Sequence, residues 1–103
     1  MRPVVFLGNS LDILRAFPDD VRRDLGFELR QVQQGRDPSD WKPMKSIGPG
    51  VREIRVRDAT GAFRVVYFAR VADAVYVLHA FQKKTQQTAK RDLDLAAARL
   101  KQI

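Results

Sequence analysis

The sequence predicts an α+β fold, in which a small antiparallel β-sheet is accompanied by an N-terminal helical hairpin and a C-terminal helix. Apolar residues recur at helical spacing near both ends of the chain, whereas short runs rich in valine and phenylalanine fill much of its second half. The length of 103 residues and the apolar content of 45% suit one globular domain, residues 1–103.

The first half is expected to contain one strand and two helices. Residues 4–7 (VVFL) form a short apolar run typical of a strand, and residues 10–16 suit a brief helix that Pro18 ends. A second helix is predicted from the Asp19–Asp20 pair to Gly35, because carboxylates stabilise the positive end of a helix dipole and glycine is common just beyond a helix. The acidic pair is therefore interpreted as a helix start, not as a pair of catalytic acids.

The second half is expected to form a β-meander followed by a helix. A loop is predicted at residues 35–43, and turns at Asp58–Gly61 and Ala72–Asp73 separate the strands. Strands joined by such short links pair in antiparallel order. The last helix is predicted to begin at Gln86 or Thr88, with Thr88 as its cap. The predicted strands are Val51–Arg57, Phe63–Arg70 and Val75–Gln82.

The predicted helices are expected to cover a single face of the sheet. Each helix is apolar along only one stripe, and that stripe must be buried against another element. The opposite face of the sheet would then stay open and carry the functional side chains.

The basic charge of the chain is concentrated in its second half. The net charge is +7, and residues 1–50 contain eight basic and seven acidic side chains, whereas residues 51–103 contain eleven and five. This asymmetry favours a polyanionic partner, either a nucleic acid or an acidic protein, although a basic surface that serves only solubility gives the same pattern. The absence of cysteine excludes disulfides and thiol catalysis. Because the apolar runs are too short for a signal peptide or a membrane span, a cytoplasmic protein without a membrane partner is expected.

Arginines interrupt the apolar residues of the predicted strands. Alternation along a strand places Glu53, Arg55 and Arg57 on one face. Arg64 lies in an otherwise apolar and aromatic strand, so it is expected either to pair with Glu53 or to lie on the open face. In the second case its planar guanidinium group suits bidentate contact with a phosphate.

The run VLHAFQKK, residues 77–84, carries the second group of candidate residues. His79 is either a structural residue or a group for proton transfer, since the ordinary pKa of histidine lies near neutrality. Phe81 suits the core or stacking on a base, and Lys83 and Lys84 suit contact with phosphate. A single histidine without cysteine does not assemble a typical metal site, so no metal or other cofactor is expected. This set of side chains is compatible with RNA cleavage by the substrate's own 2′-hydroxyl group.

Several stretches of the chain resemble the RelE/ParE superfamily of bacterial toxins and, more closely, its phage-derived HigB-like branch. The resemblance extends over nearly the whole length. It is carried by the motifs FPxxVRxxxGxxL, WKPM, GxxEIR, GAFRVVYF and LHAFQKKTQ, of which the last is the most specific. The fold that the resemblance implies agrees with the outline predicted from the residues.

The resemblance also implies a function, namely the toxin of a type II toxin–antitoxin system. Members of this family cleave mRNA without a metal, in many cases on the ribosome, and an antitoxin, for this branch usually a helix-turn-helix DNA-binding protein, neutralises each of them. By position, Arg55 matches a strand lysine that assists the 2′-hydroxyl, Arg64 an arginine that stabilises phosphate charge, and Lys84 a basic residue that acts on the leaving oxygen. The candidate site therefore comprises the catalytic residues Arg55, Arg64, His79 and Lys84 and the RNA-binding residues Arg57, Phe81 and Lys83.

Two features leave other functions open. The RelE-type site also uses a tyrosine in the last helix, and the corresponding place falls near Lys90 here, so base stacking is expected from Phe81 instead. ParE-like relatives share the fold but poison DNA gyrase. A non-nuclease toxin acting on gyrase and an inactive basic binding module are therefore the alternatives, because a fold does not fix a function.

Overall fold

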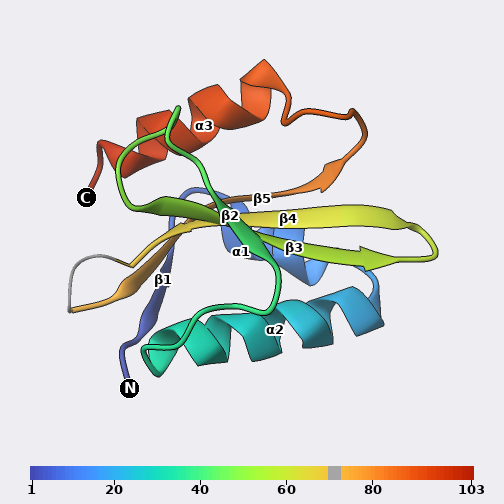
Figure 1. Cartoon of the computed structure of the whole chain (residues 1–103), viewed down its shortest axis with the longest axis horizontal. Coiled ribbons are helices and arrows are strands. Elements are labelled where there is room, and N and C mark those ends of the chain that lie inside the picture. The colour runs from blue at the N-terminus through green and yellow to red at the C-terminus, as the bar shows by residue number, and fades with distance from the viewer. Residues whose placement is uncertain (70–72) are drawn as a thin grey trace.

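Within residues 1–69 and 73–103, the part of the chain that the computed structural model describes, five strands form one sheet in the middle of the molecule (Figure 1). The order of the strands across the sheet is β1-β5-β4-β3-β2. In chain order the elements are β1 (Val4–Phe6), α1 (Ser10–Arg15), α2 (Asp19–Gln33), β2 (Trp41–Pro43), β3 (Val51–Asp58), β4 (Gly61–Phe68), β5 (Val75–Lys83) and α3 (Lys90–Leu100).

The three longest strands form the antiparallel meander that the sequence predicts. β3 pairs with β4, and β4 pairs with β5. The turn expected at Asp58–Gly61 is confirmed, because these two residues pair at the end of the β3–β4 hairpin. The expected turn at Ala72–Asp73 and the expected strand end at Arg70 lie partly or wholly outside the described residues.

The edge strands are the part of the sheet that the sequence predicts least well. β1 pairs with β5 in parallel, so the sheet is mixed. The prediction of an uninterrupted loop at residues 35–43 is wrong, because Trp41–Pro43 pairs with β3 as the edge strand β2. Three residues that include a lysine and a proline show no periodicity, and proline is tolerated in a strand only where the strand lies at an edge.

Helices cover both faces of the sheet, which corrects the expectation that they share one face. In Figure 1 the sheet lies edge-on between α2 on one side and α3 on the other. Leu25 of α2 belongs to one apolar cluster with Ile54, Phe63 and Val77, whereas Ala96 of α3 belongs to a second cluster with residues from the other face. The apolar residues of β3, β4 and β5 therefore divide between two cores.

An irregularity in β5 turns two successive side chains of this strand toward α3. Val66 pairs with His79 while the next residue, Tyr67, pairs with Val77, so Leu78 is an extra residue in the ladder. Such a β-bulge breaks the strict alternation of a strand. Leu78 packs in the α3-side cluster, and the adjacent His79 contacts α3 as well, so two successive side chains point toward the same helix.

The ends of the two longer helices test two predictions about caps. Asp19 and Asp20 lie in the first turn of α2 and pair with arginines three residues later, which confirms that the acidic pair opens a helix. The prediction that Thr88 caps the last helix is wrong: α3 has Ala89 at its N-cap, and the Thr88 hydroxyl donates a hydrogen bond to Glu53 instead. Among the described residues, none of the helices has the length and apolar character that crossing a bilayer requires.

Candidate functional site

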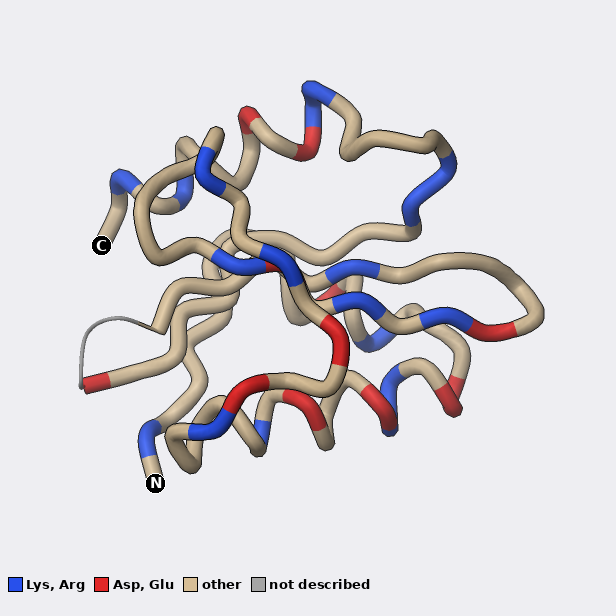
Figure 2. The backbone as a smooth tube through the Cα atoms, viewed as in Figure 1, with Lys and Arg blue, Asp and Glu red and all other residues tan. Residues whose placement is uncertain are grey.

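Basic side chains lie in register on the α3 side of the sheet, toward the end where β3 and β4 meet in a hairpin. Arg55 on β3 pairs with Arg64 on β4, and Arg64 pairs with Phe81 on β5. In the next row Arg57 and Lys83 both pair with Ala62. Figure 2 shows basic segments on the neighbouring strands β3 and β4, between the layers of α2 and α3. Pairing across the strands thus gathers side chains that are distant in sequence.

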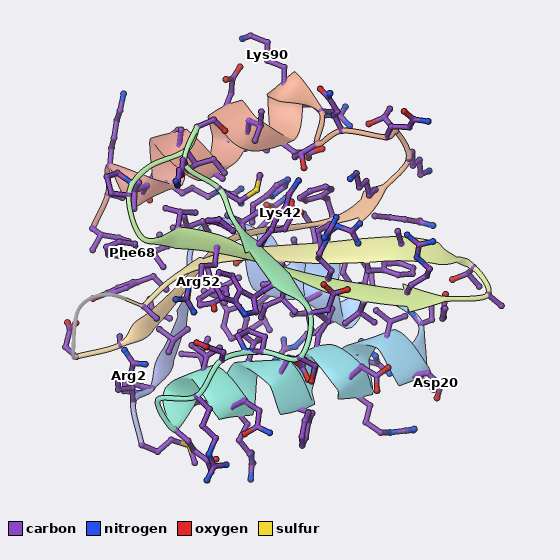
Figure 3. The ribbon with its side chains drawn as sticks, viewed as in Figure 1. Arg2, Asp20, Lys42, Arg52, Phe68 and Lys90 are labelled. Carbon is purple, nitrogen blue, oxygen red and sulfur yellow. The ribbon has the colours of Figure 1, made fainter. Side chains whose placement is uncertain are left out.

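An additional lysine, which the sequence analysis did not single out, joins this group. Lys42 on the edge strand β2 pairs with Glu53 on β3, and Figure 3 shows its side chain on the α3 side of the sheet. Its place was missed because residues 35–43 were interpreted as a loop. The set is named the basic face below and consists of Lys42, Arg55, Arg57, Arg64 and Lys83.

Arg64 forms the buried ion pair with Glu53 that the sequence left open. The Arg64 Nε lies 3.3 Å from the Glu53 Oε1, and the Glu53 side chain is 0% exposed. Arg64 Nη1 donates to the backbone oxygen of Phe63, and the Thr88 hydroxyl donates to the other Glu53 oxygen. Burial lowers the pKa of Arg64, and the nearby charges of Arg55 and Arg57 act in the same direction, whereas Glu53 opposes them. Glu53 is thus the counterion inside the basic face.

The exposed part of the basic face is a hollow of about 180 Å³ beside the buried pair. Arg55, Arg57 and Arg64 line it together with Asp40 and Val56. Arg55 is 34% exposed, and its Nη1 lies 4.0 Å from the Asp40 carboxylate, a loose contact that leaves its guanidinium group reachable. Three guanidinium groups facing one carboxylate make the hollow electropositive, and guanidinium groups bind phosphate oxygens with two parallel hydrogen bonds.

The two adjacent lysines differ in their position. Lys83 is the last residue of β5 and is half-buried on the basic face, whereas Lys84 is exposed in the segment that follows. Loss of solvent lowers the pKa of Lys83, and the charges of Arg64, Lys42 and Arg55 add to this effect against the attraction of Glu53. The structure therefore brings Lys83 into the group of Arg55 and Arg64, while the role predicted for Lys84 stays a prediction.

His79 is held on both sides of its ring by residues of α3. Its Nε2 lies 2.7 Å from the Asp92 carboxylate, and its Nδ1 lies 3.4 Å from Arg99 Nη1. The ring stacks on Phe81 with centroids 5.3 Å apart, and His79 is only 3% exposed. This geometry favours the structural role that the sequence left open for His79, and it places Phe81 largely in the core.

The partners of His79 belong to a network that the sequence analysis missed. Arg99 donates hydrogen bonds to the backbone oxygen of Leu78 at 2.9 Å and to Asn9 Oδ1 at 2.7 Å, so it connects α3 with β5 and with the start of α1. A signal was present, since Asp92, Ala96 and Arg99 recur at the spacing of one helical face. Because Ala96 is small and apolar, polar residues that share its face are candidates for buried hydrogen bonds.

The comparisons with known proteins agree with this architecture. The family model of the phage-derived Gp49-like proteins, DUF891, matches residues 12–101. The chain is similar in structure to the isolated E. coli RelE toxin with a TM-score of 0.63, at 17% identity over 84% of this chain and 89% of that one. No curated protein matches the sequence. The similarity to RelE establishes the fold, and the family model covers most of the chain. The chain therefore belongs to the Gp49-like family of phage-derived proteins, a family of RelE-like toxins.

Proposed function

We propose that this protein is the toxin of a type II toxin–antitoxin system and cleaves mRNA on the ribosome with its basic face. The observation that carries the proposal is the row formed by Arg55 and Arg64 with Lys83 beside it, next to a hollow that α3 leaves uncovered. The net charge of +7 and the membership of a RelE-like family support the same function. The RelE-like fold implies a cognate antitoxin as the partner. We propose that this antitoxin is a helix-turn-helix protein and that both proteins act in the cytoplasm.

The proposed chemistry is transfer of the phosphodiester within the RNA. The 2′-oxygen attacks phosphorus, its proton passes to a base, the bond to the 5′-oxygen breaks, and an acid protonates that oxygen. Arg55 and Arg57 are proposed to bind the phosphate. Arg64, which is buried beneath the hollow, is proposed to add positive charge to the site. Lys83 is proposed as the acid beside Lys84, since a lowered pKa makes a lysine a better proton donor near neutrality.

His79 enters the proposal as a positioning residue. As the catalytic base that the sequence suggested, it would have to leave both Asp92 and Arg99, and the stack on Phe81 would break. In the role favoured here, the His79–Phe81 stack fixes the part of β5 that precedes Lys83. The base is proposed to be Lys84, which is exposed next to Lys83, or a water molecule.

A toxin that acts on gyrase without cutting RNA is the second candidate function. The sequence of α3 has Lys90 near the place of the tyrosine that RelE-type sites use, which favours a chain that does not cut RNA, whether an inactive binding module or a gyrase toxin. Lys90 is exposed and pairs with Asp94. This position therefore offers no aromatic ring for stacking on a base. An inactive module that only binds an antitoxin predicts neither effect.

The test is cleavage of mRNA in a reconstituted translation system, with naked mRNA in EDTA as the comparison. Cuts are mapped by primer extension for the wild type and for Arg55→Gln and Arg57→Gln. These variants are preferable to Arg64→Ala, because Arg64 is buried and its removal would also affect folding. Arg30→Gln, which removes an exposed arginine from α2, is the matched control.

Ribosome-dependent cuts that both basic-face variants weaken about tenfold or more, while Arg30→Gln does not, would support the proposal. Cuts on naked RNA would indicate a free ribonuclease. Absence of cleavage in every arm, together with inhibited DNA supercoiling by gyrase, would replace the proposal with the second candidate function.

A further inference from the structure

A second hollow lies on the opposite side of the sheet from the basic face. It has a volume of about 220 Å³ and is bordered by the end of α2 and by β3 and β4. We name it the arginine pocket, after three of the side chains that line it. In Figure 3 two of these, Arg2 and Arg52, lie on the α2 side of the sheet. The polar side chains of its lining are Arg2, Arg36, Asp37, Arg52 and Tyr67.

The Tyr67 hydroxyl is the first observation that points to a ligand. Tyr67 is 1% exposed, and its hydroxyl proton has no acceptor in hydrogen-bond geometry among the described residues, although the guanidinium group of Arg52 lies close enough to act on the phenol oxygen. Burial raises the pKa of Tyr67 against the opposing effect of Arg52, so the phenol stays neutral and can donate its proton. A buried hydroxyl without an acceptor is costly, and native proteins usually supply a partner. The unfilled requirement in this pocket is for an acceptor oxygen.

Arg52 is the second observation, because it already holds a carboxylate at the rim of the pocket. Arg52 Nη1 donates to Asp37 Oδ1 at 2.8 Å, and the guanidinium group lies over the Trp41 ring at 3.9 Å. Stacking on the indole keeps the guanidinium plane fixed, which suits a planar oxyanion. Asp37 is 67% exposed, so an external oxyanion can compete with it for Arg52. Asp37 therefore behaves as an internal stand-in for a ligand.

Arg2 and Arg36 contribute positive charge to the pocket, while they donate hydrogen bonds to other groups of the protein. Arg2 donates to the backbone oxygens of Ala69 and Val32, which fixes it between the sheet and the end of α2. Arg36 is hydrogen-bonded to glutamine side chains of the same helix end. Three guanidinium groups face one carboxylate in the lining, so the pocket carries an excess of positive charge.

From this arrangement we infer that the arginine pocket binds an oxyanion, namely the carboxylate or phosphate group of a small ligand. The oxyanion replaces Asp37 at Arg52 and accepts the hydrogen bond of the Tyr67 hydroxyl. Because the pocket joins the N-terminal segment, the end of α2 and the sheet, a bound ligand stabilises the contacts among these three parts. The site is separate from the basic face and does not depend on nuclease activity.

The experiment is an NMR titration of the full chain, labelled with nitrogen-15, with sodium phosphate and with sodium acetate at constant ionic strength. The backbone amides of Gly35 and Gly50, which line the pocket, serve as reporters. Saturable shifts of both amides are expected with at least one of the two anions. Saturation by phosphate alone indicates a phosphate ester as the natural ligand, and saturation by acetate alone indicates a carboxylate.

Three variants locate the binding. Tyr67→Phe is expected to weaken the affinity about tenfold, the cost of one hydrogen bond to a charged acceptor. Asp37→Asn is expected to strengthen it, because the internal competitor is gone. Arg57→Gln removes a charge from the basic face and should leave the shifts of Gly35 and Gly50 unchanged.

Either of two results would overturn the inference. One is that neither anion gives saturable shifts at Gly35 and Gly50, in the wild type or in Asp37→Asn. The other is that Tyr67→Phe, folded as judged by its spectrum, binds both anions as tightly as the wild type does.

Discussion

Removing the Glu53 carboxylate should destabilise the fold strongly, because it leaves the buried charge of Arg64 without a counterion. Glu53 is completely buried and the Arg64 side chain is 4% exposed, so water cannot replace the lost partner. Breaking a buried ion pair from one side costs about 3–5 kcal/mol. Arg64 Nε and Glu53 Oε1 are 3.3 Å apart but do not form a hydrogen bond. Because Glu53→Ala would break no hydrogen bond between these two atoms, we expect a cost at the lower end of this range. We therefore expect Glu53→Ala to cost about 3 kcal/mol, or roughly 14 °C in the unfolding midpoint.

The assay is urea and thermal unfolding followed by circular dichroism, for the wild type, Glu53→Ala, Arg64→Met and the double variant. The double variant should recover part of the loss, since replacing both members of a buried pair by apolar side chains is often close to neutral. A loss in the double variant that is smaller than the sum of the two single losses is the signature of the pair in this double-mutant cycle. A loss of less than about 1 kcal/mol for Glu53→Ala would refute the reasoning, because that is the behaviour of a solvent-exposed pair.

Three further predictions concern hydrogen bonds and protonation. Thr88→Ala should lower the free energy of unfolding by about 1 kcal/mol in urea titrations, because Glu53 loses the hydroxyl that donates to it at 3.1 Å. The Thr60 hydroxyl lowers the pKa of Asp58, so Thr60→Val should raise that pKa in an NMR titration. The stability that Asp58 contributes is present above its ordinary pKa of 3.8 and is lost as the pH falls through the lowered value. If Lys83 is the acid in RNA cleavage, kcat falls as the pH rises through its lowered pKa, and Lys83→Arg should reduce kcat and remove this dependence.

Most of the fold could be predicted because its signals are local. The spacing of Val21, Leu25 and Leu29 alone indicates α2, and the alternation in Val51–Arg57 indicates β3 and assigns Arg55 and Arg57 to one face. The bulge at Leu78 could not be predicted, since an apolar run gives no sign of a residue inserted in its ladder. Without the bulge, strict alternation would put Leu78 and His79 on opposite faces, so the position of both side chains on the α3 side could not be predicted.

The candidate site could be predicted only as far as strand alternation reaches. Alternation and the resemblance together select Arg55, Arg57 and Arg64, and the pairing of β3 with β4 brings these residues together. The environment of His79 depends on Asp92 and Arg99, which lie 13 and 20 residues further along the chain. No local pattern specifies such contacts, because they depend on how α3 docks.

The docking of α3 connects the stability of the fold with the geometry of the proposed site. At one end of the helix, Arg99 bonds to Leu78 and Asn9; before its other end, Thr88 bonds to Glu53. The segment between β5 and α3 begins with Lys84 and contains Thr88. Thr88 donates to Glu53, the same carboxylate that pairs with Arg64, so Glu53 holds this segment in place. A change at Glu53 therefore alters the guanidinium group and the lysine-bearing segment together. It follows that Thr88→Ala, which spares Arg64, is the variant that separates the position of this segment from the charge of the basic face.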